Sequence, residues 1–150
     1  SHAEGYSTEA TAVSSHSEGS DSQATSQGAH AEGRNTVASG NASHAEGNYT
    51  TASGIHSHAE GYENESSGKY SHVGGRGNTA VNECHTVIGK YATIDTTGKK
   101  IFQVGGGTSK NDRKDLFVIN NDGTFILSNG TDTPVKSETL FIYAMFGKPK

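Results

Sequence analysis

The stretch Ser-His-Ala-Glu-Gly, residues 1–5, returns intact or slightly altered at residues 15, 29, 43, 57 and 71. The first half of the chain therefore has a strict 14-residue period. Fourteen residues are too few for two helices and a turn, but they fit two short strands and two tight corners. Successive coils would then stack about 4.8 Å apart. The period predicts an all-β fold, a parallel β-roll solenoid of 14-residue coils.

Residues at the same position in successive coils form columns, and two columns consist mostly of small residues. Because alternate side chains of a strand face opposite ways, we expect these columns to line the interior of the roll. The predicted interior alanines are Ala3, Ala10, Ala24, Ala31, Ala38, Ala45, Ala52, Ala59 and Ala80. With such small side chains the two sheets must lie closer than the usual distance of about 10 Å.

The composition offers little apolar area to stabilise this roll. Only 30% of the residues are hydrophobic, so the free energy gained by burying apolar area offsets little of the entropy lost when the backbone is ordered. We expect two further contributions: main-chain hydrogen bonds between coils, and burial of one outer face against copies of the same chain. Disorder is the alternative for a tract rich in Ser, Gly and Thr, but a fixed period argues against it.

The repeat is best preserved at residues 43–54, where Ser-His-Ala-Glu-Gly is followed by two variable residues, Thr, a variable residue and Ala-Ser-Gly. This pattern resembles the head repeat of trimeric autotransporter adhesins of the YadA type, and related repeats in tail-fibre and appendage proteins of phages that infect Gram-positive bacteria. The resemblance covers residues 1–90 and implies a left-handed β-roll assembled as a homotrimer. The adhesin repeat usually has Val and Ile where this chain has His2 and Glu4, and residues 86–89, Thr-Val-Ile-Gly, return toward that form.

In the resembled adhesins the Val and Ile columns lie near the axis where the chains meet, so this chain would place histidine and glutamate there. The residues concerned are His2, Glu4, His16, Glu18, His30, Glu32, His44, Glu46, His58, Glu60 and His72. Each imidazole can meet carboxylates of its own chain, of a neighbouring chain or of the next coil. We interpret these columns as an inter-chain ladder of hydrogen bonds and ion pairs. Plain solvent exposure and metal binding are the alternatives, and stacking already accounts for the regular repetition.

The ladder interpretation makes a prediction about pH. Pairing with carboxylates would raise the imidazole pKa above about 6.5 and give greatest stability in mild acid. Burial without pairing would favour neutral histidine and make mild acid destabilising.

The composition changes after residue 90. Residues 91–95, 101–104, 116–120 and 124–128 are β-prone, and Asn121-Asp122-Gly123 is a strong hairpin signal. We expect residues 91–130 to form a small antiparallel β cap over the open edge of the last coil. Residues 112–130 resemble a run that follows the roll in phage appendage and adhesin proteins. Residues 131–150 form a tail whose apolar strand at 139–146 either joins the cap or augments a neighbouring subunit.

Several classes of function are disfavoured. A net charge of −4 without a basic surface argues against a nucleic-acid partner. Cys84 is the only cysteine, which excludes a disulfide framework and the Pro-Cys-x-x-Cys partner that His-Ala-Glu needs in zinc deaminases. The apolar run of the tail is shorter than the roughly twenty residues that span a bilayer as a helix, so we expect no direct membrane insertion. We expect no enzyme activity, no catalytic residue, no cofactor and no metal site.

The sequence favours a structural and adhesive module: a rigid trimeric rod or head of a phage tail fibre, an appendage or a bacterial surface adhesin. Its expected place is extracellular, on a virion tail or a bacterial surface, and its expected partners are further copies of itself and a host-surface glycan or protein. The alternative is a spacer or trimerisation module attached to a catalytic or self-cleaving domain outside this chain. Since Ser1 begins in mid-pattern, we expect the chain to be a piece of a longer protein.

Overall fold

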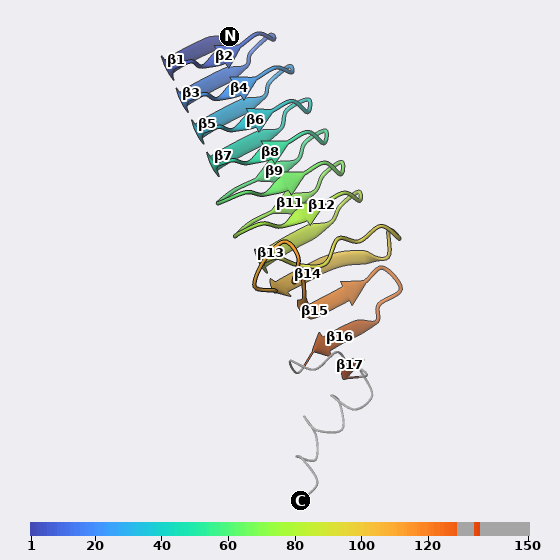
Figure 1. Ribbon diagram of the computed structural model, residues 1–150. Coiled ribbons are helices and arrows are strands. Elements are labelled where there is room, and N and C mark those ends of the chain that lie inside the picture. The colour runs from blue at the N-terminus through green and yellow to red at the C-terminus, as the bar shows by residue number, and fades with distance from the viewer. Residues whose placement is uncertain (129–133, 136–150) are drawn as a thin grey trace, which may run out of the picture.

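The computed structural model describes residues 1–128 and 134–135. Within these residues the chain is all-β, with seventeen strands in two sheets and no helix. The coils stack along one axis from the N-terminal strand β1 to β13, and strands β14 to β16 follow at the far end (Figure 1). The predicted strand at 139–146 and most of the tail at 131–150 lie outside the described residues.

Each of the first six coils contributes one strand to each of two sheets, which we call the long sheet and the short sheet. The long sheet contains, in order, β1 (His2–Tyr6), β3 (His16–Ser20), β5 (His30–Arg34), β7 (His44–Asn48), β9 (His58–Ala59), β11 (His72–Val73), β13 (Thr86–Lys90), β14 (Lys100–Gly106), β15 (Asp115–Asn120), β16 (Phe125–Ser128) and β17 (Pro134–Val135). The short sheet contains β2 (Glu9–Ala10), β4 (Gln23–Ala24), β6 (Val37–Ala38), β8 (Thr51–Ala52), β10 (Glu65–Ser66) and β12 (Thr79–Ala80).

Pairing within the roll is parallel and in register with the sequence period. His16 lies opposite His30 in the long sheet, and Ala24 lies opposite Ala38 in the short sheet. Each residue therefore lies beside the residue of its own column in the next coil. The predicted parallel β-solenoid is confirmed.

Small side chains fill the space between the two sheets. The fully buried alanines are Ala24, Ala31, Ala38, Ala45, Ala52, Ala59 and Ala80. Two residues that the sequence places in the interior are not buried: Ala3 is exposed and Ala10 is only half-buried. Both belong to the first coil, which has a neighbouring coil on one side only, so the open end of the roll leaves them in contact with solvent.

Polar side chains at the corners hold the interior together. The Ser43 hydroxyl donates to the Gly40 carbonyl at 2.8 Å, and the Thr50 hydroxyl donates to the Glu46 carbonyl at 3.0 Å. In a later coil the Asn78 amide donates to Gly74 O at 2.9 Å. Because buried backbone carbonyls need partners, these bonds allow tight corners to be buried in a roll with few large apolar groups.

The corners also use left-handed backbone at residues other than glycine. Eleven such residues have φ between 46° and 57°, among them Tyr49 and His56. The cost of this conformation is about 1–2 kcal/mol per residue. Hydrogen bonds to the preceding coil offset it, as when the Tyr49 amide donates to Arg34 O at 3.0 Å.

The long sheet continues beyond the repeats. Strand β14 pairs in parallel with β13, placing Phe102 opposite Thr86, and β15 and β16 then add in antiparallel orientation. The predicted turn at residues 121–123 is present, with the Gly123 amide donating to Asn120 O at 3.1 Å.

Two expectations for this region are wrong. Residues 91–95 form no strand, and residues 101–104 pair in parallel with the roll on one side and antiparallel with β15 on the other. The edge of β13 presents a row of unpaired backbone groups, and β14 satisfies them directly. One continuous sheet therefore joins the roll to the hairpin.

Candidate functional site

The histidine column forms a continuous stack of imidazole rings on the outer face of the long sheet. From His16 to His72, successive ring centroids lie 4.7–4.9 Å apart with interplanar angles of 1–8°. Only His2, at the open end of the roll, is tilted against its neighbour, by 63°. The distance between parallel strands imposes this stack, because the side chains of one column project in the same direction.

The glutamate column runs beside the histidine column, and the pairing between them changes along the roll. His2, His16 and His30 lie 3.2, 3.9 and 3.7 Å from the carboxylate of their own coil. His58 and His72 instead approach Glu46 and Glu60 of the preceding coil, at 3.6 and 3.4 Å. The change occurs at His44. We call these two columns the His–Glu ladder, consisting of His2, Glu4, His16, Glu18, His30, Glu32, His44, Glu46, His58, Glu60 and His72.

Most of these approaches are too long to be hydrogen bonds. The Nε2 atoms of His16, His30, His44 and His58 are inaccessible to solvent and have no hydrogen-bond partner within the chain. Buried polar atoms are almost always paired in native proteins. The ladder of one chain therefore presents a row of nitrogens whose hydrogen-bonding capacity is unused.

Burial changes the electrostatics of the ladder. Burial and the neighbouring imidazoles lower the pKa of His30, His44 and His58 below the ordinary value of 6.5. Nearby carboxylates, Glu32 and Glu60 among them, act in the opposite direction without outweighing these effects. For His30, His44 and His58 of a single chain, the expectation that pairing raises the imidazole pKa is wrong, because burial and the neighbouring imidazoles outweigh the carboxylates.

A shallow groove runs along the acidic side of the ladder. Its volume is about 490 Å³, and it is lined by Glu18, Glu32, Gly33, Glu46, Gly47, Glu60, Gly61 and Gly75. The glycines leave room beside the carboxylates, so a row of negative charge borders an open channel along the roll axis.

Stability is expected to fall as pH falls from about 7.5 to about 5. Because the folded-state pKa of the three central histidines is lowered, the unfolded chain binds more protons in this range. Their contribution to stability is full above the unfolded pKa and is lost as pH falls from there through the folded pKa. Buried His85, whose pKa burial also lowers, acts in the same direction. Calorimetric melts in a chelator-containing buffer measure the effect.

The triple variant His30→Gln/His44→Gln/His58→Gln serves as the control for the pH dependence. Its profile should be flatter, with a residual slope from His85. Higher stability in mild acid would instead favour the carboxylate pairing that the sequence predicts.

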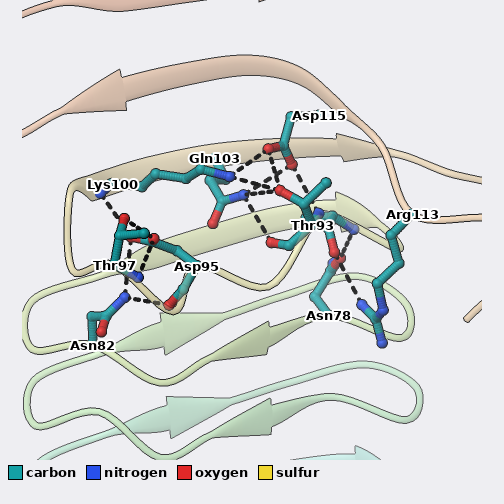
Figure 2. A network of polar contacts seen from close by, with 10 residues as sticks. Asn78, Asn82, Thr93, Asp95, Thr97, Lys100, Gln103, Arg113 and Asp115 are labelled. Atoms are coloured by element: carbon teal, nitrogen blue, oxygen red, sulfur yellow. Dashed lines mark hydrogen bonds and ion pairs between the residues drawn. The ribbon is translucent and has the colours of Figure 1, made fainter. Parts of the chain in front are cut away.

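A second polar cluster joins the roll to the hairpin, and Figure 2 shows Lys100, Gln103 and Thr93 around Asp115, and Thr97 and Asn82 beside Asp95. Asp115 of β15 accepts hydrogen bonds from Lys100 Nζ at 2.7 Å and Gln103 Nε2 at 2.9 Å, and also from Thr93. Asp95 accepts from the amides of Thr97 and Lys100 at 2.9 and 2.8 Å. We call this group the junction network.

Asp95 of the junction network and His85, which feels the charges of Asp95 and Lys100, both have perturbed pKa values. Burial by itself would raise the pKa of Asp95, but hydrogen bonds from Thr97 and the Lys100 amide outweigh it and lower the pKa to about 2. His85 is fully buried where earlier coils place a small residue, and both of its ring nitrogens lack a hydrogen bond. The sequence reasoning missed this network. The available signal was the lengthened coil, since Gly89 pairs with Gly105 and the register shifts from 14 to 16 residues.

One corner of the coils carries aromatic side chains that are open to a partner. Tyr49 and Tyr62 are 50% and 38% exposed, and their rings meet edge to face with centroids 6.4 Å apart. The Arg76 guanidinium lies 5.4 Å from the Tyr62 ring and 5.7 Å from the Tyr91 ring. We call this set the aromatic corner.

The described residues contain no helix that could cross a membrane. The fold and the ladder define the chain as a parallel β-solenoid repeat protein. Comparisons with protein-family models, with curated proteins and with solved structures found no match.

Proposed function

We propose that the chain is a structural and adhesive module, a rigid rod or head that works as a homotrimer on a phage tail fibre, an appendage or a bacterial surface. In this proposal it acts outside the cell and presents a repeated surface to a host glycan or protein. The observation that carries the proposal is the unpaired row of buried Nε2 atoms on one face of the roll.

The row of unpaired nitrogens supports self-association. The imidazole rings are themselves partly exposed, so rotation of the rings would let carboxylates of a second and third copy reach the Nε2 atoms of His16, His30, His44 and His58. The interior supports the same conclusion, because its alanines bury little apolar area per coil. Burying the ladder face between copies of the chain would add the missing stabilisation.

The aromatic corner supports a recognition surface. Tyrosine and arginine are over-represented at sites where proteins bind partners, since each combines a large flat surface with a polar end. Tyr49 and Tyr62 belong to neighbouring coils and point out from a rigid scaffold. A glycan with apolar ring faces and hydroxyl groups fits this combination.

The C-terminal strands support a capping role for residues beyond 90. Strands β14, β15 and β16 continue the long sheet past the last repeat, so the edge of β13 is not open to uncontrolled pairing. Phe117 contacts Phe102 on one side and Phe125 on the other, and these rings supply apolar contacts that the roll lacks.

The purified chain is expected to sediment as a species with three times the chain mass of 15.6 kDa. Mass photometry or analytical ultracentrifugation at micromolar concentration provides the measurement. A well-folded monomer would contradict the trimer and remove the main support for the proposal.

The same oligomer, applied to a glycan array and to host cells, tests adhesion. Tyr62→Ala should weaken binding, while Tyr70→Ala, an exposed tyrosine at the other corner of the coil, is the matched control. Equal binding of the two variants would show that the aromatic corner is not part of the adhesive surface.

A further inference from the structure

We propose that the His–Glu ladder binds divalent first-row transition-metal ions, with Zn²⁺ as the representative ion, at two sites: His30–Glu32–His44 and Glu46–His58–Glu60. The sites use residues of one chain, so the proposal does not depend on the trimer. It adds a ligand-binding role to a face whose proposed function is assembly.

The fold brings the ligand atoms together in threes. In each site a histidine nitrogen or a carboxylate oxygen from each of the three residues lies within 4.8 Å of the other two. The first site spans strands β5 and β7, and the second uses Glu46 of β7, His58 of β9 and Glu60 directly after β9. The parallel register that repeats the sequence thus also repeats a set of metal ligands.

The ligand types fit a borderline transition metal. Imidazole nitrogen and carboxylate oxygen are both common zinc ligands, whereas magnesium and calcium prefer oxygen alone. Three protein ligands leave a fourth position of a tetrahedral ion open to water. The two sites differ in composition, with two histidines and one glutamate in the first and one histidine and two glutamates in the second.

The side chains can close around an ion without a change in the backbone. Ligand bonds of about 2.0–2.2 Å require ligand atoms closer together than those of the free ladder, so side-chain rotation must bring them in. The side chains of His30 and Glu32 are each 34% exposed, and those of His58 and Glu46 are 34% and 32% exposed. Side chains that are partly open to solvent have the freedom to rotate.

The unpaired nitrogens are an independent observation that points to a ligand. The Nε2 atoms of His30, His44 and His58 are inaccessible to solvent and lack hydrogen-bond partners, although each ladder carboxylate is only a few ångströms away. A metal ion between nitrogen and carboxylate would satisfy both groups, which a direct contact of 3.6–3.7 Å does not.

The test is a zinc titration of the full chain after exhaustive treatment with a chelator. Isothermal titration calorimetry and competition with a chromophoric zinc chelator should show two saturable sites per chain. Cu²⁺ in place of Zn²⁺ should give an electron paramagnetic resonance spectrum with imidazole nitrogen coupling, and excess Mg²⁺ should not compete.

Matched variants assign the sites. His44→Gln should weaken the first site and His58→Gln the second, each at least about tenfold, because loss of a direct ligand costs no less than loss of a supporting group. His56→Gln should retain both sites, since His56 lies at a corner and stacks on Tyr70. Circular dichroism of the metal-free variants confirms that they are folded.

Loss of one site in each ladder variant, with both sites kept in the control, supports the proposal. Absence of saturable zinc binding, or binding that neither His44→Gln nor His58→Gln alters, overturns it. A trimer that binds no zinc leaves the proposed assembly intact and rejects only the metal sites.

Discussion

Replacing Gly47 by alanine is expected to destabilise the roll by roughly 4 kcal/mol or more. Gly47 has φ of +102°, which side-chain-bearing residues rarely adopt, and a Cβ atom there would lie 2.3 Å from the Gly61 carbonyl oxygen. The clash involves backbone of the next coil, so no side chain can move aside. Relief requires the coils to separate, which breaks the ladder of hydrogen bonds between β7 and β9.

Gly28→Ala is the matched control for Gly47→Ala. Gly28 has φ of +65°, its added Cβ would meet nothing nearer than 3.8 Å, and the same column holds Ala42 with φ of 49°. Its cost should be about 1 kcal/mol. Chemical denaturation with circular dichroism measures the free energy of unfolding of both variants. Comparable losses of stability would show that the close approach of the coils at Gly47 adds no cost to the substitution.

The repeated coils show how much of this fold the sequence predicts. A strict period defines the coil length, and in-register stacking then determines every column, so the roll and its alanine interior follow from spacing alone. The exposure of Ala3 and Ala10 does not follow, because a residue in these columns is buried only where a coil stacks on each side of it.

The electrostatics of the ladder were less predictable. Sequence spacing places a glutamate two residues after each ladder histidine from His2 to His58, which favours pairing within a coil. The structure adds a competing distance, the 4.7–4.9 Å between stacked imidazoles, and a choice of carboxylate from the preceding coil. The sign of the pKa shift depends on burial and on these neighbours together, and neither is visible in a list of residues.

The junction network was the least predictable part. Asp95 and Asp115 are twenty residues apart in irregular sequence, with no period to align them, and they meet Lys100 only because β14 adds to the roll in parallel. A pattern that predicts β14 as part of a separate antiparallel unit cannot bring these groups together. Within the roll, the repeat predicts which residues lie side by side. Beyond the last repeat, neighbours are set by long-range contacts that the sequence period does not predict.

Asp115→Asn is expected to destabilise this junction by roughly 2–4 kcal/mol. The substitution keeps the shape but removes the negative charge facing Lys100 Nζ, whose side chain is 22% exposed. It also turns one acceptor into a donor among groups that already donate, Thr93 N and Gln103 Nε2. Because these residues lie between β14 and β15, the hairpin should open before the roll does.

Hydrogen exchange followed residue by residue distinguishes the two parts of the chain. In Asp115→Asn the amides of β14 to β16 should exchange faster, while those of β5 and β7 in the middle of the roll keep their protection. Asp112→Asn is the control, since Asp112 is exposed and its carboxylate accepts a hydrogen bond from the hydroxyl of nearby Thr108, and it should change the free energy of unfolding by no more than about 0.5 kcal/mol. Faster exchange throughout the roll would mean that hairpin and solenoid unfold as one cooperative unit, in which case the junction network stabilises the whole stack of coils and not its end alone.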